Sequence, residues 1–343
     1  MKTIGLHSVR AYIKLGLFFY YKKITVVNIG AIPKGKPVLF LSNHQNALLD
    51  ALLIATTCNR TPYFLTRAGV FKMTFIGKLL NGLRMLPVYR KRDGWGTIKN
   101  NNAIFETCAA LLNTGKSVGV FPEGNHNLKR TVRPLSRGFT RIVFETLDHF
   151  PNTDLQIIPV GMNYRNPKFF GDSTTVVYGD PIRVKQFDIG NRSEGVLQLK
   201  ESVFEAIKRL TTHISTKDYD DTLLTLKSKK VNFLKPEAVN DFILKGIERN
   251  DLKSKNKPFI LKRILKVLLI LNLILPYCIW KLVAEPKIKE AEFVDTFRFA
   301  IAITLVPFWL VLLTITFGLT LGWSFGFAYM ISVLSLAMLA IKA

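Results

Sequence analysis

The chain has 343 residues, a formal net charge of +24 and 48% hydrophobic residues. A basic excess of this size favours an anionic partner, such as nucleic acid, an anionic bilayer surface or a phosphorylated substrate. The apolar residues gather after residue 258, and no nucleic-acid-binding signature accompanies the basic residues, so lipid is favoured and nucleic acid is not expected. The 3 scattered cysteines exclude a disulfide framework.

Residues 1–24 predict a helix that lies on the membrane surface. Arg10, Lys14, Lys22 and Lys23 interleave with aromatic and aliphatic side chains. This composition is typical of an interfacial helix on an anionic bilayer. The alternative is an ordinary helix that packs on the following domain.

Residues 25–217 predict one α/β domain, because short apolar runs alternate with longer helical patterns. Such alternation indicates a sheet covered by helices. The predicted strands are 38–41, 63–66, 85–89, 117–121, 155–160 and 174–178, and the predicted helices are 97–112, 137–147 and 196–210.

The remaining residues divide into a charged segment, 218–258, which is expected to be helical or linker-like, and an apolar region, 259–343. Residues 264–283 are long enough to span a bilayer core of about 30 Å, with a kink at Pro276. Residues 299–341 carry no charge and predict two further helices broken around 318–322. We therefore expect an integral membrane protein with about three spans.

Basic residues crowd the entry to the first predicted span. By the positive-inside rule this flank, and the domain before it, is expected on the cytoplasmic face. These residues are Lys253, Lys255, Lys257, Lys262, Arg263 and Lys266.

A histidine and a carboxylate follow the first predicted strand of the domain. His44 comes directly after the strand, and Asp50 lies just beyond it on a predicted helix start. A carboxylate that orients an imidazole is the arrangement required for a general base. Polar side chains at the carboxyl end of a strand lie where α/β proteins place their sites.

Three other predicted strands end in residues that suit the same rim. Phe121-Pro122-Glu123-Gly124 ends one with a carboxylate and a glycine that permits close backbone approach. Arg90 follows another, and a guanidinium there can bind a phosphate. Arg133 and Arg137 lie shortly after Glu123, and a Pro-Val pair, Pro159-Val160, ends the last strand.

These four blocks, in this order, resemble those of the glycerolipid acyltransferase family, which includes lysophosphatidate, glycerol-3-phosphate and dihydroxyacetone-phosphate acyltransferases. The resemblance covers roughly residues 25–190, and Phe121–Gly124 is its most specific element. It implies an acyltransferase-type α/β fold, with an N-terminal interfacial helix and a C-terminal transmembrane region added in this chain.

The resemblance also implies a mechanism. His44, oriented by Asp50, would deprotonate the acceptor hydroxyl, which would attack the thioester of acyl-CoA or acyl-carrier protein. Arg90 would hold the acceptor phosphate, and Glu123 and Gly124 would shape the acceptor site. Asn43 and the cations Arg133 and Arg137 are further expected substrate contacts. No cofactor, metal or covalent enzyme intermediate is implied.

Two departures from the family pattern bear on the site. Five residues separate His44 from Asp50, where the family usually has four. One extra helical residue rotates a side chain by about 100°, so the backbone must adjust before the helix begins. After Gly124 the chain has Asn125-His126-Asn127 instead of Thr-Arg-Ser, which makes His126 a candidate substrate contact. Both variants resemble fungal-type glycerol-3-phosphate or dihydroxyacetone-phosphate acyltransferases.

The favoured activity is acyl transfer to 1-acyl-glycerol-3-phosphate, which gives phosphatidate. Acyl transfer to glycerol-3-phosphate or dihydroxyacetone phosphate is the alternative acceptor chemistry. A non-catalytic protein that binds anionic lipids is a more remote alternative, because lipid binding requires neither His44 nor Asp50.

Overall fold

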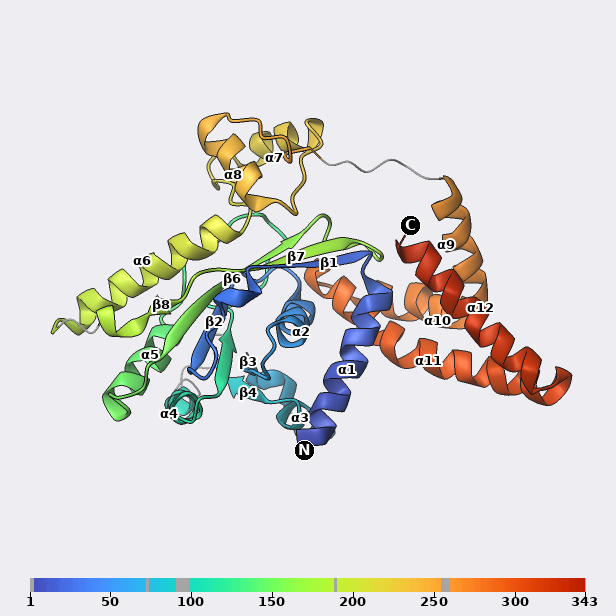
Figure 1. Ribbon diagram of the computed structural model, residues 1–343, viewed down its shortest axis with the longest axis horizontal. Helices are drawn as coiled ribbons and strands as arrows, with labels where there is room; N and C mark the ends of the chain where they lie inside the picture. Colours follow the sequence, from blue (N-terminus) through green and yellow to red (C-terminus); the bar gives the residue numbers. More distant parts are fainter. Residues whose placement is uncertain (1–2, 72–73, 91–98, 188–189, 254–259, 343) are drawn as a thin grey trace.

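A central eight-stranded sheet organises the computed structural model, which describes residues 3–71, 74–90, 99–187, 190–253 and 260–342 (Figure 1). The strand order is β1-β7-β6-β2-β5-β3-β4, with β8 paired to β6. Neighbouring strands are parallel except where β7 and β8 run antiparallel to β6. The α/β prediction is confirmed.

All six predicted strands are present, and two short ones were missed. The strands are β1 (Lys23–Val27), β2 (Val38–Ser42), β3 (Tyr63–Arg67), β4 (Met85–Val88), β5 (Ser117–Val120), β6 (Gln156–Tyr164), β7 (Ser173–Tyr178) and β8 (Ile182–Arg183). The missed β1 lies at the sheet edge and is only half-buried, so its sequence lacks a continuous apolar run. The predicted domain boundary at residue 25 falls within this strand.

The helices of the α/β domain cover both faces of the sheet. They are α1 (Thr3–Tyr20), α2 (Ala47–Thr57), α3 (Thr74–Gly82), α4 (Asn101–Asn113), α5 (Gly138–His149) and α6 (Arg192–Leu210). The first two residues of the helix predicted at 97–112 lie outside the described residues. The start of α6 is stabilised by Asn191, whose side-chain oxygen accepts the N–H groups of Ser193 and Glu194.

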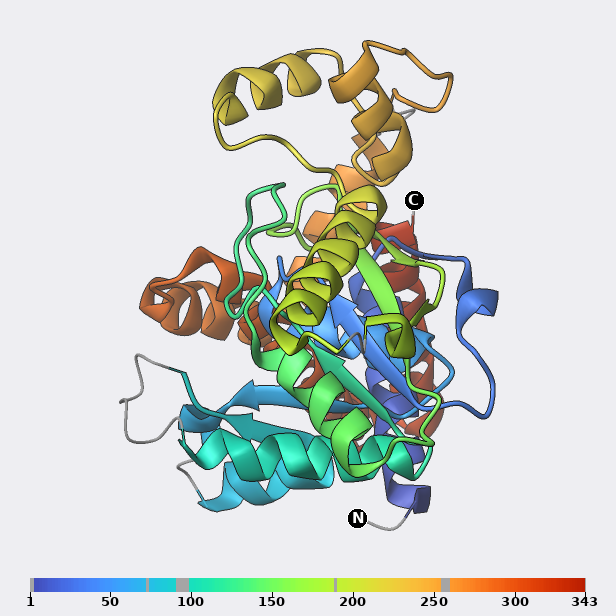
Figure 2. The same ribbon diagram turned by 90° about the vertical axis from the view of Figure 1, so that its left-hand side faces the viewer.

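Two hydrophobic cores result, one on each face of the sheet. The helices α4, α5 and α6 cover the face of the sheet that is nearest the viewer in Figure 2. Along β2, Leu39 and Leu41 belong to the core on that face, whereas Val38 and Phe40 belong to the core on the side of α1 and α2. This alternation follows from the two-residue period of a strand. The second core also receives Phe299 from the C-terminal region, so the apolar tail packs directly on the domain.

The charged segment is a small helical unit and not an extended linker. It contains α7 (Tyr219–Ser228) and α8 (Pro236–Lys245), which lie beyond the end of α6 in Figure 1. Pro236 suits the first turn of α8, and Gly246 ends that helix in the left-handed conformation. Tyr219, Leu226 and Val239 form part of its own buried core.

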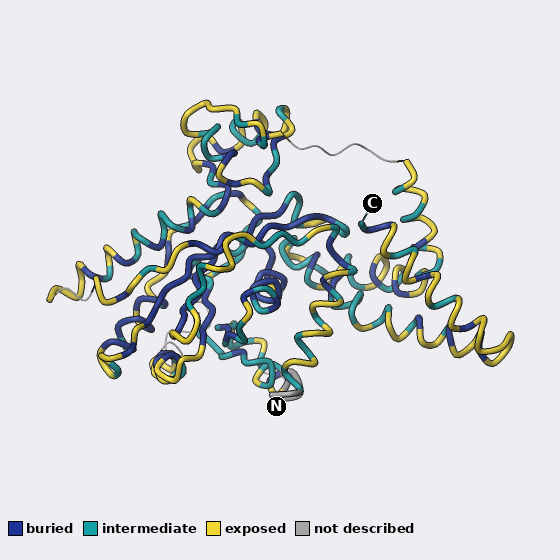
Figure 3. The backbone as a smooth tube through the Cα atoms, viewed as in Figure 1, coloured by how far each residue is buried: buried dark blue, intermediate teal, exposed yellow. Residues whose placement is uncertain are grey.

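Two helices of the tail are long and apolar enough to cross a membrane. They extend over Ala291–Leu321 and Trp323–Lys342, containing α11 (Val294–Leu321) and α12 (Trp323–Lys342), and the predicted break falls at Gly322. Figure 3 shows many exposed residues along these helices, among them Phe308, Leu319 and Phe325. Exposed apolar surface of this extent suits contact with lipid.

The predicted first span is sharply bent. The helix α9 (Ile260–Asn272) meets the segment Ile274–Lys287, which begins with α10 (Ile274–Cys278), at 96°. Pro276 is the physical cause, because it lacks the N–H that would bond the carbonyl of Asn272 and its ring crowds that carbonyl. The indole of Trp309 donates to this carbonyl instead, at 3.0 Å. The break thus lies one turn before the proline. Among the described residues, two straight helices could cross a membrane, and the number of candidate spans is three if the bent pair counts as one.

The helix predicted to lie on the membrane surface has two different faces. Leu17 and Tyr20 of α1 are buried in the sheet core, whereas Tyr12, Leu15 and Phe18 are exposed. The buried face packs on the following domain, which was the alternative prediction. The exposed face has the aromatic and aliphatic composition expected of an interfacial helix.

We predict that Gly161→Ala destabilises the fold by about 1–3 kcal/mol. A Cβ at Gly161 of β6 would lie 2.1 Å from the carbonyl oxygen of Leu210 at the end of α6, so helix and strand would have to separate. The thermal midpoint of the detergent-solubilised protein measures the effect. Gly30→Ala is the control, because nothing lies within 4 Å of a Cβ there; equal midpoints for the two variants would contradict the prediction.

Candidate active site

The sheet topology brings His44 and the Phe121–Gly124 block together. β2 lies between β5 and β6, with Leu41 opposite Val120 and Ser42 opposite Val160. The chain therefore leaves β2 and β5 side by side at the same edge of the sheet. The rings of His44 and Phe121 stack there with centroids 3.9 Å apart and planes inclined by 12°.

His44 and Asp50 form a hydrogen-bonded pair. His44 Nδ1 lies 2.8 Å from Asp50 Oδ2, and the side chain of Asp50 is fully buried while 12% of that of His44 is exposed. The pair thus has one buried member and one that reaches the surface of the site. This is the geometry expected of a base and the group that orients it.

Asp50 is surrounded by donors. The backbone N–H groups of Gln45 and Asn46 each donate to Oδ2 at 2.8 Å, and the Tyr164 hydroxyl donates to Oδ1 at 2.6 Å. Such a set of donors stabilises the charged carboxylate, which can only accept. We therefore assign the proton of the neutral imidazole to His44 Nδ1, which leaves Nε2 as the basic atom.

The extra residue between His44 and Asp50 is accommodated where the loop joins α2. Asn46 has φ −129° and ψ 53°, and Ala47, the first residue of α2, has φ +35°. A positive φ is rare for a residue with a Cβ. The loop thus turns tightly enough to restore the His44–Asp50 contact, and the expected backbone adjustment is present.

Glu123 and Arg133 form a second, largely buried pair beside His44. Arg133 Nε donates to Glu123 Oε2 at 2.6 Å, and another nitrogen of Arg133 bonds the carbonyl of Asn125. Burial raises the pKa of the Glu123 carboxyl to about 7, although the Arg133 charge and a backbone hydrogen bond from His44 oppose the rise. Gly124 has φ +72°, which a glycine adopts without strain, so the chain can turn at the end of β5.

Asn43 connects two strands. Its amide nitrogen donates to the carbonyl of Met162 at 3.1 Å, and its oxygen accepts the N–H of Met162 at 2.7 Å. The carboxamide therefore holds the start of the His44 loop to β6. The predicted contact of Asn43 with substrate stays a prediction.

Comparison with known proteins agrees with this geometry. Residues 23–163 match the family model described as Acyltransferase. This part of the chain is an acyltransferase domain. It contains His44, Asp50, Arg90, Glu123, Gly124 and Arg133, so the resemblance predicted from the motifs is confirmed.

Two curated relatives of this acyltransferase domain are each 26% identical. Glycerol-3-phosphate O-acyltransferase 1 of Saccharomyces cerevisiae matches over 153 residues, 40% of this chain and 20% of that protein. The 1-acyl-sn-glycerol-3-phosphate acyltransferase of Borreliella burgdorferi matches over 161 residues, 47% of this chain and 59% of that protein. The chain thus spans less than two thirds of the length of either relative.

A solved structure is also similar. The 1-acyl-sn-glycerophosphate (LPA) acyltransferase PlsC of Thermotoga maritima is 18% identical and covers 62% of this chain and 81% of its own, with a TM-score of 0.44.

The other predicted site residues lie at different distances from the His44–Asp50 pair. His126 has its ring centroid 5.6 Å from that of His44. Arg90, just after β4, is close enough for its charge to contribute to a lowered pKa of His126, whose main cause is burial. Arg137 lies at the start of α5 with its side chain exposed, and no ion pair joins it to Glu123 within the described residues.

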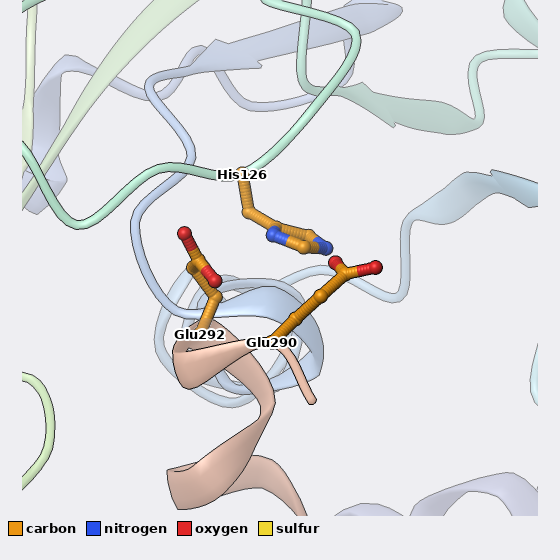
Figure 4. A group of neighbouring side chains, drawn as sticks. All are labelled: His126, Glu290 and Glu292. Atoms are coloured by element: carbon orange, nitrogen blue, oxygen red, sulfur yellow. The ribbon is translucent and has the colours of Figure 1, made fainter. Parts of the chain in front are cut away.

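The tail contributes residues to the site that the sequence did not reveal. Glu290 and Glu292 flank the imidazole of His126 (Figure 4), and the possible ligand atoms of the three side chains all lie within 4.8 Å of one another. One imidazole with two carboxylates has the composition of a divalent-metal ligand set. Their carboxylates are partly or fully exposed, and the expectation that the site requires no metal stays a prediction.

Sequence reasoning also missed Tyr164. It lies at the carboxyl end of β6, 114 residues from Asp50, and donates to that carboxylate from full burial. The available signal was its place four residues after the Pro159-Val160 block, just beyond the predicted strand 155–160. A tyrosine there is otherwise indistinguishable from a core residue.

We predict that Glu123 makes stability depend on pH. Because burial raises its folded pKa to about 7, above the ordinary value of 4.5, its stabilising contribution is complete below about pH 4.5 and is lost as the pH rises through 7. Relative to Glu123→Gln, the wild-type protein should lose stability on the order of 3 kcal/mol across this window. Thermal midpoints at pH 5 and pH 8 measure the difference.

The matched control is Glu106→Gln, which replaces an exposed carboxylate on α4. Its stability relative to wild type should change little between the two pH values. If the stability difference between wild type and Glu123→Gln is also the same at the two pH values, the Glu123 carboxyl does not have a raised pKa.

Proposed function

We propose that the protein is a membrane-bound O-acyltransferase that transfers a fatty acyl group from acyl-CoA or acyl-carrier protein to 1-acyl-glycerol-3-phosphate, giving phosphatidate. The observation that carries this proposal is the pairing of His44 Nδ1 with the buried, fully hydrogen-bonded Asp50. A lipid-binding surface requires no such pair. The match of residues 23–163 to the acyltransferase family model supports the same chemistry.

The proposed reaction is a direct transfer. His44 Nε2 removes the proton of the acceptor hydroxyl as the oxygen attacks the thioester carbonyl, and Asp50 stabilises the imidazolium that forms. The tetrahedral intermediate then collapses, the C–S bond breaks, and the imidazolium returns its proton to the leaving thiolate. The reaction requires neither a metal nor a covalent enzyme intermediate.

The acceptor is proposed to bind on the Glu123 side of His44. Arg90 suits a phosphate because a guanidinium offers two parallel donors. Glu123 and Arg133 are paired with each other, which points to a role for the pair in shaping the acceptor site around Gly124. Arg137 and His126 are proposed as secondary contacts, and the ring centroid of His126 lies 5.6 Å from that of His44.

Glycerol-3-phosphate or dihydroxyacetone phosphate is the second candidate acceptor. The five-residue His44–Asp50 spacing and the Asn125–Asn127 variant favour it, as does the similarity to a yeast protein named as a glycerol-3-phosphate O-acyltransferase. The apolar tail favours an acceptor that already carries an acyl chain, because such an acceptor resides in the membrane. We therefore place lysophosphatidate first.

The proposed location is the membrane, with the acyltransferase domain on its cytoplasmic face. The two apolar helices of the tail support insertion, and the basic residues around Lys253 and Lys262–Lys266 support the orientation. Lys255 and Lys257 of that predicted cluster lie outside the described residues. Anionic lipid head groups are the proposed contacts of this surface.

We predict that His44→Ala lowers acyl transfer by about 10²–10⁴-fold while membrane association is retained, because only the general base is lost. Membranes containing each variant are given radiolabelled acyl donor with lysophosphatidate and glycerol-3-phosphate in separate reactions. His149→Ala, at the end of α5 and exposed, is the control and should retain activity. Undiminished transfer by His44→Ala would overturn the assignment of the site.

We predict that Tyr164→Phe lowers kcat by about tenfold, because Asp50 Oδ1 loses its hydroxyl donor. Tyr178→Phe is the matched control, since Tyr178 is equally buried in the same core but bonds Thr57. Steady-state kinetics should give a lower kcat for Tyr164→Phe than for Tyr178→Phe, even when the thermal midpoints of the two variants fall by the same amount. Equal kcat values would argue against a role for Tyr164 at Asp50.

A further inference from the structure

The C-terminal region returns to the active site through residues 290–298. After the bent helix pair, a short 3-10 turn, Ala291–Phe293, leads into α11. Phe293 contacts His126 edge-on with ring centroids 4.5 Å apart, and Glu290 and Glu292 flank the same imidazole (Figure 4). The segment that enters the predicted membrane span thus forms one wall of the site.

Asp295, in the first turn of α11, reaches further into this wall. It is 2% exposed, and its Oδ2 accepts a hydrogen bond from the amide of Asn46 at 3.0 Å. The hydroxyl of Tyr20 donates to its Oδ1, and Arg298 approaches the same oxygen at 3.4 Å. One carboxylate therefore collects donors from α1, from the loop before α2 and from α11.

Asn46 connects Asp295 to the His44–Asp50 pair. Its backbone N–H donates to Asp50, and its side chain is fully buried. The amide nitrogen bonds Asp295 and the carbonyl of Pro167, which are both acceptors, so the orientation of the carboxamide is determined. The amide oxygen has no partner among the described residues, which adds a cost to this arrangement.

The loop itself is strained. Ala47 has φ +35° directly after Asn46, and a conformation of this kind persists only when its surroundings impose it. The carboxylate of Asp295 accepts a hydrogen bond from Asn46, the residue immediately before Ala47. Burying this carboxylate itself costs free energy.

We propose that Asp295 is a positioning residue that holds the His44–Asp50 loop in its catalytic conformation, so that the C-terminal membrane region completes the active site. The kinetic part of this inference rests on the acyl-transfer function proposed above. Asp295 touches neither reacting atom, and it acts through Asn46.

The test compares Asp295→Ala with two other variants of the full chain in lipid nanodiscs. Asp295→Asn retains an oxygen that can accept from Asn46, so it should recover much of what alanine loses. Tyr12→Phe is the matched control, because it removes the hydroxyl with which α1 bonds the carbonyl of Ile303 on α11 and leaves Asp295 untouched. Both Asp295→Ala and the control weaken the docking of α11, but only Asp295→Ala releases Asn46.

Two measurements are made on each variant. Hydrogen–deuterium exchange of residues 43–50 requires no substrate and should be about tenfold faster or more in Asp295→Ala than in Tyr12→Phe. Acyl transfer should show kcat lowered by about 10–100-fold in Asp295→Ala with KM nearly unchanged, an intermediate kcat in Asp295→Asn and a normal kcat in Tyr12→Phe.

The inference is overturned if residues 43–50 exchange as in wild type in Asp295→Ala, or if Tyr12→Phe changes exchange and kcat as much. Failure of the proposed function is recognised separately. If wild type transfers no acyl group but Asp295→Ala loosens the loop selectively, the positioning role stands and the acyltransferase assignment falls.

Discussion

One buried carboxylate organises this protein. Asp50 is fully buried at the start of α2, where a charged group is costly unless its oxygens are hydrogen-bonded. Two donors come from the preceding loop, one from the imidazole of His44 and one from Tyr164 at the end of β6. The need to hydrogen-bond the buried Asp50 carboxylate therefore determines three features at once. These are the loop conformation, the tautomer of His44 and the position of α2 against the sheet.

The sheet order provides the frame for that carboxylate. β2 is central, and its parallel neighbours β5 and β6 carry the Phe121–Gly124 block and Tyr164 to the same edge. The face opposite α4, α5 and α6 is covered by α1, α2 and the start of α11. The apolar tail and the geometry of the candidate site are thus linked, because α11 belongs to the tail and its first turn also contacts the loop before α2.

Local patterns predicted six of the eight strands of the described sheet, and they singled out His44 and Asp50, which the structure brings into contact. A buried parallel strand is a short apolar run, and the polar residue that ends it stands out in the sequence. The failures have physical reasons. β1 is a half-buried edge strand without such a run. The bend predicted at Pro276 is present but lies at Leu273, between α9 and α10, because the proline leaves the carbonyl of Asn272 without its helical donor. The His44–Asp50 contact across an extra residue depends on φ +35° at Ala47, which no helical periodicity predicts.

The sequence by itself determined the α/β class and the apolar tail, and it singled out His44, Asp50 and Glu123 as candidate site residues, since each of these inferences depends on residue type and short-range spacing. Tertiary structure decided which groups support them. Tyr164 and Asp295 lie 114 and 249 residues from their partners Asp50 and Asn46, and a tyrosine or aspartate in isolation carries no sign of the atom it will bond. Burial supplies that information, because a buried polar group requires a partner and only the folded chain determines which one is within reach.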